Sequence, residues 1–503
     1  MKNNIYATIE VGSYEVKMLV CNLREERLFV LAQKCVPSVG IERGQITNLD
    51  KLVGQIKKLK ELVEVDLQQP VKNLILTMPP IEVAIEHTLG RVNLDVKQPI
   101  SAEDVRKLFR QLMNTSHHEG HFPIGLIPRL FKIDENHVVQ NPRGLSGMNL
   151  GLEASRILMP ATTVANLVHA VERAGFKVDD IIVGSIAQTM ANISSPEGFA
   201  RTCDVNVGHD MTTITIVNDG KIIHANALSI GGSHLTRGIM DAFGITAELA
   251  TELKNRYGKV ISHTGEVTDH QVIHIDETKE LFITRGMLNE VITVCADQLF
   301  QVVRGHIVDE LRLREQEYQY TLTGGSAELP NLIVALQNQL PMVATVHRPS
   351  MLGVRDAKFA TLVGVTIFAH EITLLLDTKA GIQTMDFSAN TPVGEKKLTS
   401  KQDVIPHVGR VTAPQNKIDP NYQPQSLKDA IAGATPVANK PGGQNLRVQP
   451  KKMPLFDDLD EPFAATTVLP QVDNYMDQKL ENSGVLARFF GKILNETEEE
   501  TQD

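Results

Sequence analysis

Apolar and polar residues alternate, or apolar residues run together, in three short segments at the start of the chain. Ile5 to Val11, Glu15 to Asn22 and Leu28 to Ala32 therefore predict three successive strands. From Asn48 to Val65 the apolar residues instead recur every three or four positions, which predicts a helix. A strand from Leu74 to Met78 follows. The pattern predicts a compact α/β unit at the start of the chain.

A similar order begins again near the middle of the chain. Strands are predicted at Asp204 to Val207, Thr212 to Val217 and Lys221 to Leu228, and Asn218-Asp-Gly220 has the composition of a hairpin turn. Later segments predict helices at Thr236 to Phe243, at Ala247 to Tyr257, within Leu281 to Ile307 and at Lys358 to His370, and a strand at Tyr318 to Thr323. Two related α/β halves predict two lobes joined by a hinge.

Residues 84 to about 160 interrupt this repeat. An alternating strand at Val83 to Leu89 precedes a helix that begins at Ser101-Ala-Glu-Asp104, where Ser101 is a good N-cap. The segment Asn141 to Gly147 is rich in turn residues. Afterwards the helix Thr162 to Ala174, the strand Asp179 to Val183 and a helix from Ser185 resume the first pattern. We interpret 84–160 as an inserted small α/β domain.

The composition changes beyond about Lys379, where Pro, Gln, Asn, Lys, Gly and Asp dominate until about Lys479. This predicts a disordered linker, whose roughly 100 residues would span about 55 Å as a flexible coil. The chain then ends in a short segment that predicts an amphipathic helix. Its apolar side is formed by Val485, Leu486, Phe489, Phe490, Ile493 and Leu494, flanked by Arg488 and Lys492. Such a helix is expected to bind anionic membrane lipids; the alternative is docking on the protein's own body or in a partner's groove.

Three separated glycine turns predict one split phosphate-binding site. They are Glu10-Val-Gly12-Ser13, Asn206-Val-Gly208 and Thr323-Gly324-Gly325-Ser326. Each follows a strand pattern, and each is expected to precede a helix, so that backbone N–H groups surround a polyphosphate in a cleft between the lobes. Lys17 would add a positive charge. A single Gly-Gly turn after a strand is more often a plain turn, but three such turns in a duplicated topology favour phosphate binding.

Charge and composition exclude several other classes of function. With 503 residues, a formal net charge of −10 and no Trp, the chain lacks the basic, aromatic surface of a nucleic-acid-binding protein. The cysteines are far apart and are expected to be reduced core thiols; they are Cys21, Cys35, Cys203 and Cys295. His117, His118 and His121 are interpreted as part of a solvated loop, because no Cys or carboxylate set nearby completes a metal site. No signal peptide and no uninterrupted apolar run of 18 residues is found, which predicts a cytosolic body.

Several motifs of the folded part, with the tail, resemble the FtsA family, the actin-like bacterial cell-division proteins. The most specific is Asn141-Pro-Arg-Gly-Leu-Ser-Gly147, together with Ile127-Pro and Ile133-Asp134, which resembles the signature of the family's inserted 1C domain. The remaining segments resemble nucleotide contacts: Glu10 to Ser13 with Lys17, Ser229-Ile-Gly-Gly232 with Thr236, Lys254 near Tyr257-Gly258, and Leu322-Thr-Gly-Gly325.

The resemblance implies an α/β fold of the actin, Hsp70 and hexokinase type: a two-lobed ATPase with an inserted 1C domain. Its implied subdomains are 1A (1–83, 161–198, 355–378), 1C (84–160), 2A (199–242, 319–354) and 2B (243–318), before the linker (379–480) and the membrane-targeting helix (483–496). ATP or ADP would contact Gly12, Ser13, Lys17, Asn206, Gly208, Gly231, Gly232, Lys254, Gly324, Gly325 and Ser326. Mg²⁺ would be held through water by Glu10 and Asn206.

The resemblance also implies partners. The family's proteins form protofilaments, attach to the cytoplasmic face of the membrane at the division septum, and anchor the ring of the tubulin-like FtsZ through its C-terminal tail. Later division proteins are expected to bind through 1C. FtsZ docking is implied at 2B, where the helix beginning near Arg285 keeps Leu288, Val291 and Ile292. Many relatives carry Arg where this chain has Cys295, so the individual contact residues are left open.

The second phosphate loop departs from the family pattern. Many relatives read Asp-x-Gly-Gly-Gly-Thr, whereas this chain has Asn206-Val-Gly-His-Asp-Met-Thr212. Asn keeps a hydrogen bond but lacks the charge that holds magnesium through water, so hydrolysis should suffer more than binding. His209 and Asp210 replace Gly, which makes close approach of the backbone to the phosphates harder. A slow ATPase at most is expected.

Two other functions on the same fold are kept as alternatives. A sugar kinase or chaperone ATPase would need a catalytic carboxylate in the cleft or a strand-rich peptide-binding domain after the body, and neither is evident in the sequence. A pilus-assembly adaptor would share the body, but it would not be expected to carry a long linker and an amphipathic tip. The polymer that tethers a partner to the membrane is therefore the leading hypothesis.

Overall fold

A computed structural model describes residues 4–24, 27–114, 121–134, 137–193, 201–261, 269–276, 281–314, 317–340, 343–349 and 353–377. The predicted linker and tail helix, with His117 and His118, lie outside the described residues. The described chain divides into two compact units. Of the described residues, the first contains those up to Leu228, His306–Glu328 and those from Leu340 to Asp377; the second contains Ser229–Gly305 and Leu329–Gln339.

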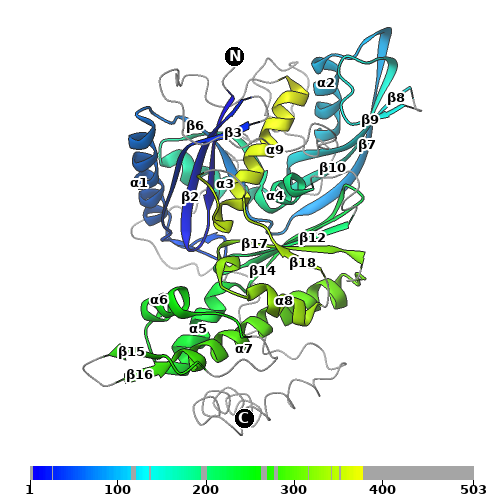
Figure 1. The fold of residues 1–503 in the computed structure, drawn as a ribbon. Helices are drawn as coiled ribbons and strands as arrows, with labels where there is room; N and C mark the ends of the chain where they lie inside the picture. Colours follow the sequence, from blue (N-terminus) through cyan, green and yellow to red (C-terminus); the bar gives the residue numbers. More distant parts are fainter. Residues whose placement is uncertain are drawn as a thin grey trace, which may run out of the picture. The chain divides into compact units, whose positions relative to one another are not determined.

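The first sheet of the larger unit is built from the start of the chain (Figure 1). Its strand order is β11-β6-β1-β2-β3, with β1, β2 and β3 antiparallel and β6 and β11 parallel to β1. The strands are β1 (Asn4–Val11), β2 (Glu15–Arg24), β3 (Arg27–Pro37), β6 (Asn73–Met78) and β11 (Lys177–Val183). A small ribbon, β4 (Ile41–Glu42) with β5 (Gln45–Ile46), follows β3.

Helices pack on both faces of this sheet because each has one apolar side. Helices α1 (Leu49–Leu67) and α3 (Ala161–Arg173) contact each other and strands β2, β3 and β11. Helices α4 (Gly184–Asn192) and α9 (Ala360–Leu376) contact each other, and α9 also contacts β1 and β2. The side chain of Asn48 caps α1 by accepting the N–H of Lys51 at 3.0 Å.

The second sheet of the same unit repeats the first. Its order is β14-β13-β12-β17-β18, again with three antiparallel strands joined to two parallel ones. The strands are β12 (Arg201–Val207), β13 (Thr212–Asn218), β14 (Lys221–Leu228), β17 (Gln319–Thr323) and β18 (Ala344–Val346). The predicted hairpin after Asn218 is confirmed, with φ +50° at Asp219 and +72° at Gly220. The duplicated order confirms the repeat that the sequence predicts.

Between these sheets in the chain lies a third, of order β7-β10-β8-β9, covered by α2 (Ala102–Met113). Its strands are β7 (Ala84–Pro99), β8 (His121–Ile133), β9 (His137–Val139) and β10 (Ser146–Pro160). The helix start predicted at Ser101 is confirmed by a full capping box with Asp104. Strands β8 and β10 are not predicted by the sequence analysis. Pro128 interrupts the apolar alternation of β8, and the pairing with β10 shifts register beside it.

The second unit is mostly helical. It contains α5 (Gly232–Phe243), α6 (Ala247–Tyr257), α7 (Arg285–Arg304), α8 (Leu332–Gln339) and the hairpin of β15 (Val272–Asp276) with β16 (Leu281–Thr284). Helix α7 continues into a π-helical turn, η1 (Gly305–Glu310). The 3₁₀ turns η3 (Gly325–Glu328) and η4 (Ala357–Phe359) belong to the larger unit. The subdomain limits drawn from the sequence stay a prediction.

Two helical segments, Arg285–Glu310 and Ala357–Leu376, are long and apolar enough to cross a membrane. Most residues of both are buried within the fold. In α9, for example, Leu362, Val365 and Ile372 are fully buried. Their apolar composition is explained by core packing, so length and hydropathy alone do not indicate a membrane span.

Candidate nucleotide-binding site

The first two glycine turns are tight β-hairpins. The N–H of Gly12 donates to the carbonyl of Glu15 at 3.1 Å, and the N–H of Gly208 donates to that of Met211 at 2.9 Å. Each turn joins two antiparallel strands, so the prediction that all three turns precede helices is wrong for these two. The elements that follow these turns are the strands predicted at Glu15 to Asn22 and at Thr212 to Val217. Only the third turn enters a helix, the 3₁₀ turn η3.

The third turn lies directly against the second. The hydroxyl of Ser326 donates to the carbonyl of Gly208 at 3.1 Å. Gly324 has φ +90°, and a Cβ there would lie 2.4 Å from Asn206 Oδ1 and 2.5 Å from the carbonyl oxygen of Val207. Only glycine fits this position, both for its backbone conformation and for the close approach.

The second turn contacts the first turn through His209 and the β4–β5 turn through Asp210. The ring of Tyr14 stacks on that of His209, with centroids 4.9 Å apart and an angle of 35° between planes. The carboxylate of Asp210 accepts the N–H of Arg43 at 3.3 Å. The larger unit therefore brings all three predicted turns together, and Gly12, Ser13, Asn206, Gly208, Gly324, Gly325 and Ser326 all belong to these turns or to the residues beside them.

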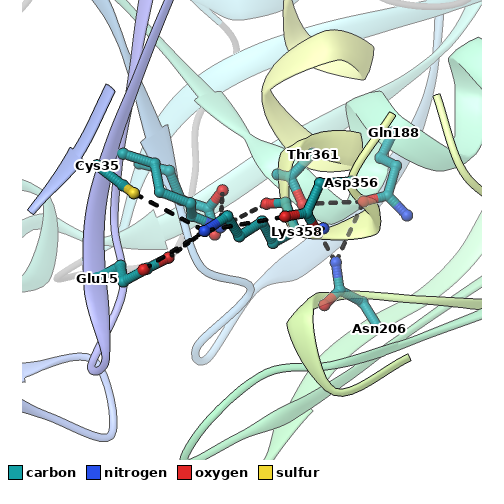
Figure 2. A network of polar contacts seen from close by, with 9 residues as sticks. Glu15, Cys35, Gln188, Asn206, Asp356, Lys358 and Thr361 are labelled. Atoms are coloured by element: carbon teal, nitrogen blue, oxygen red, sulfur yellow. Dashed lines mark hydrogen bonds and ion pairs between the residues drawn. The ribbon is translucent and has the colours of Figure 1, made fainter. Parts of the chain in front are cut away.

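Two lysines stand beside the first turn, and both are paired. Lys17 Nζ lies 3.0 Å from a carboxylate oxygen of Glu10 and donates to the carbonyl of Lys358 at 2.7 Å. Lys358 Nζ lies 3.2 Å from Glu15 and 3.8 Å from the sulfur of Cys35, as Figure 2 shows. Burial lowers the pKa of Lys358, but Glu15, Cys35 and Asp356 together outweigh this and hold that pKa above its usual value. The two lysines at this turn are thus paired with the carboxylates of Glu10, Glu15 and Asp356.

Lys358 is not among the site residues that the sequence predicts. In the sequence it has the character of a helix start, because Asp356 and Lys358 directly precede a long apolar run. A lone cation at the edge of such a run is the only local signal. In the structure the side chain of Asp356 accepts the N–H of Lys358 at 3.0 Å, which forms η4 and turns the lysine toward Glu15.

A buried polar chain supports the second turn from behind. Gln188 Nε2 donates to Asp204 Oδ2 at 2.6 Å and to Thr323 Oγ1 at 2.8 Å. Gln188 Oε1 accepts from Asn206 Nδ2 at 3.1 Å and from Thr361 Oγ1 at 2.9 Å (Figure 2). Asn206 Nδ2 also donates to Thr361 Oγ1 at 3.1 Å. Gln188 and Asp204 are at most 2% exposed.

Close helix packing puts Gln188 in this place. A Cβ on Gly364 of α9 would lie 2.4 Å from Gln188 Cα, so α4 and α9 cross at van der Waals distance there. Burial raises the pKa of Asp204 to about 7, against the opposing hydrogen bonds from Thr189, Gln188 and Thr323. Neither Gln188 nor Asp204 is predicted as a site residue by the sequence, because one occupies an ordinary helix position and the other an ordinary strand position.

The remaining predicted contacts belong to the second unit. Lys254 Nζ donates to Thr236 Oγ1 at 2.7 Å and to the carbonyl of Gly232 at 3.0 Å. Gly231 is the N-cap of α5, which begins at Gly232, four residues earlier than predicted. Burial lowers the pKa of Lys254 to about 8. Gly231, Gly232 and Lys254 therefore form a local group around the start of α5.

The donor set suits a phosphate group better than a metal ion. Among the described residues no group of three His, Cys, Asp or Glu side chains is placed to hold a metal. Glu10, one expected magnesium ligand, is paired with Lys17. Asn206, the other, directs its amide nitrogen at Gln188 and Thr361. The residues present therefore do not fit the magnesium site that the family resemblance implies.

The cysteines agree with the prediction of reduced thiols. All four are free; Cys21, Cys203 and Cys295 are buried and Cys35 is partly so. Burial and the neighbouring Glu15 raise the pKa of the Cys35 thiol.

Comparison with known proteins identifies two regions of the chain with family models. Residues 203–364 match the family described as "Cell division protein FtsA". Residues 82–158 match the family described as "SHS2 domain inserted in FTSA". The second match covers most of the sheet β7-β10-β8-β9 with α2.

Curated relatives carry the same description. The chain is 24% identical over 389 residues to "Cell division protein FtsA" of Bacillus subtilis, covering 76% of this chain and 87% of that protein. It is 24% identical over 374 residues to the protein of that name from Streptococcus pneumoniae, covering 74% and 81%. With the protein of that name from Escherichia coli the identity is 23%, covering 72% and 90%.

Solved structures show similar but more distant folds. The "PilM-PilN type IV pilus biogenesis complex" covers 72% of this chain and 97% of that chain at 14% identity, with a TM-score of 0.49. MreB5 of Spiroplasma citri bound to ADP covers 75% and 99% at 11% identity, with a TM-score of 0.45. At these scores the actin-like assignment rests on the duplicated strand order and the two family models.

Proposed function

Because this chain belongs to the FtsA family of cell-division proteins and has an actin-like fold, we propose that it is an ATP- or ADP-binding scaffold. It polymerises on the cytoplasmic face of the cell membrane and anchors the FtsZ ring at the division septum. The observation that carries this proposal is the match to two family models in the chain order expected of an inserted domain. Fold alone would not support it, since the same fold serves many functions.

Nucleotide binding is supported by the three turns that meet in the larger unit. The phosphates would lie at Gly12, Ser13, Gly208, Gly325 and Ser326. Lys17 and Lys358 would donate to phosphate oxygens while keeping their carboxylate partners, because each ammonium group has three N–H donors. The family resemblance also implies nucleotide contacts from Gly231, Gly232 and Lys254, which belong to the second unit. The bound nucleotide serves as an assembly cofactor and is hydrolysed slowly at most.

Membrane attachment rests on the tail sequence. The apolar side from Val485 to Leu494 would enter the acyl boundary, and Arg488 and Lys492 would lie at the anionic headgroups. Attachment of each protomer would be weak, and polymerisation would strengthen it by linking many tails.

FtsZ binding is proposed at the second unit. Leu288, Val291 and Ile292 are buried on α7, so a docking peptide would contact the outward residues of that helix instead. Cys295 is buried as well, and a Cβ on Gly238 of α5 would lie 2.3 Å from its sulfur. An arginine at position 295 would collide with α5. The contacts to FtsZ must therefore differ here from those of relatives that carry Arg. Later division proteins are proposed to bind the inserted sheet.

Liposome co-sedimentation of the full chain and of a chain ending at 480, with and without ATP, tests the proposal. The full chain should sediment with anionic liposomes more completely when ATP promotes assembly, and the shortened chain should stay in solution. Equal sedimentation of both chains would contradict a membrane tether in the tail. Sedimentation that does not respond to ATP would contradict the coupling of attachment to assembly.

A pilus-assembly adaptor, the alternative that the sequence analysis leaves open, is the second candidate. The two family models favour cell division, and a pilus adaptor would not be expected to match the inserted-domain model. Absence of binding of an FtsZ tail peptide to the body would favour this second candidate.

A further inference from the structure

The orientation of the Gln188 amide is fixed by the groups behind it. The nitrogen end of the Gln188 amide faces Asp204, whose Oδ2 also accepts the hydroxyl of Thr189 at 3.2 Å. That nitrogen lies 2.6 Å from Asp204 and 2.8 Å from Thr323 Oγ1. The oxygen end of Gln188 therefore points forward, toward residue 206.

Residue 206 must in turn be a hydrogen-bond donor. Gln188 Oε1 lies 3.1 Å from the Asn206 side-chain nitrogen, and that nitrogen lies 3.1 Å from the hydroxyl oxygen of Thr361. A carboxylate at 206 would place an oxygen against Gln188 Oε1. Turning the Gln188 amide around would relieve that contact but would place Oε1 against Asp204. The acceptor behind the second turn thus requires a neutral amide donor within it.

The other expected metal ligand is also engaged. Glu10 lies opposite Lys17 in the pairing of β1 with β2, and their charged groups are 3.0 Å apart. Lys17 is additionally held by the carbonyl of Lys358 at 2.7 Å. A magnesium ion or its water shell would have to compete with a fixed ammonium group for this carboxylate.

We infer that Gln188 is a specificity-determining residue that keeps position 206 a neutral donor, so that this site binds nucleotide without recruiting Mg²⁺. The inference rests on the proposed function, because it concerns the same phosphate site. Lys17 and Lys358 supply the positive charge beside the phosphates, and any Mg²⁺ that enters is carried by the nucleotide, with no contact to a protein carboxylate.

Calorimetry with the full chain at pH 8 tests the inference directly. ATP is titrated once with excess Mg²⁺ and once with EDTA. We expect the two dissociation constants to agree within about a factor of 3. Binding at least tenfold weaker in EDTA would overturn the inference while leaving nucleotide binding intact. Absence of binding in both titrations would refute the proposed nucleotide site, and the inference with it.

A double variant that exchanges two residues tests the role of Gln188. In D204N/N206D the negative charge moves two positions along β12. The Gln188 amide can then turn around, accepting from the new amide at position 204 and donating to the new carboxylate at position 206. This variant has the same composition as the parent, and we expect it to bind ATP at least tenfold more tightly with Mg²⁺ than with EDTA.

Each single variant serves as a control for the double variant. N206D should melt at a lower temperature than both the parent and the double variant, because two carboxylates then face one amide. D204N should bind ATP equally with Mg²⁺ and EDTA. If N206D is as stable as the parent, or if the double variant gains no dependence on Mg²⁺, the Asp204–Gln188 pair does not determine the chemistry of position 206.

Discussion

Replacing Asp204 by Asn should change how the stability of the protein depends on pH. Burial raises the pKa of Asp204 to about 7, whereas an aspartate in an unfolded chain ionises near 3.9. Between these values the folded chain holds a proton that the unfolded chain has released. The contribution of Asp204 to stability is therefore greatest at low pH, falls as the pH rises toward 7, and is constant above that value.

The size of the effect follows from the pH interval. One pKa unit corresponds to 1.36 kcal/mol, so the two units from pH 5 to pH 7 give at most about 3 kcal/mol. The amide introduced by D204N cannot ionise and lacks this dependence. The decrease in the free energy of unfolding caused by D204N should thus be about 3 kcal/mol smaller at pH 8 than at pH 5. The difference arises because Asp204 of the parent protein loses its proton between these two pH values.

Urea unfolding followed by circular dichroism measures this difference; the chain has no Trp to serve as a fluorescent probe. Asp50→Asn is the matched control, since it removes the same charge from a side chain that is 84% exposed. That control should show no comparable change between the two pH values. A difference between the parent and D204N that is independent of pH, or that grows toward pH 8, would refute the burial argument.

Three further predictions concern the proposed function. ATP turnover should stay far below about 1 per second, because Asn206 offers no carboxylate; steady-state phosphate release at that rate or faster would contradict this. A peptide copying the tail of the host's FtsZ should bind the body and bind more weakly after the exposed Gln301 and the half-buried Glu290 are changed to Lys, and binding that survives both changes would exclude α7 as the site. Replacing Phe489 and Phe490 by Asp should weaken binding to anionic liposomes by a factor of hundreds or more, since each buried aromatic contributes about 1.5 to 3 kcal/mol. Exchanging Arg488 and Lys492 for Glu should cost less, at about 1 kcal/mol per cation, and the opposite order of severity would indicate electrostatic adsorption.

The regular elements could be predicted because each has a clear period and a clear stop. Helix α6 (Ala247–Tyr257) and strand β14 (Lys221–Leu228) have the bounds that the sequence predicts. Strand β8 could not be predicted, because its pairing tolerates Pro128 only through a shift of register with a distant strand. Such a compensation lies in the partner strand and leaves no mark in the local sequence.

The candidate site, too, is only partly predictable from the sequence. The three turns are visible in the sequence because glycine is required locally, as at Gly324 with φ +90°. Gln188 and Lys358 are not visible, since nothing local distinguishes them from ordinary helix residues. Their roles depend on contacts with Asp204 and Glu15, which are 16 and 343 residues away in the chain. The chemistry of position 206 is thus determined by tertiary contacts.

Helix α9 connects the phosphate turns to the inserted sheet, which constrains how any change at the turns can spread. At its start, Thr361 binds Gln188 and Asn206, and the carbonyl of Lys358 just before it binds Lys17. At its end, Arg106 donates to the carbonyl of Leu376 at 2.5 Å and Arg143 donates to that of Leu374. These arginines satisfy terminal carbonyls and complement the negative end of the helix dipole. A ligand that draws Lys17 away from the Lys358 carbonyl removes one hydrogen bond at the start of α9 and leaves those of Thr361. Because Arg106 and Arg143 hold the end of α9, a shift of the helix along its axis either moves the inserted sheet with it or breaks these two hydrogen bonds.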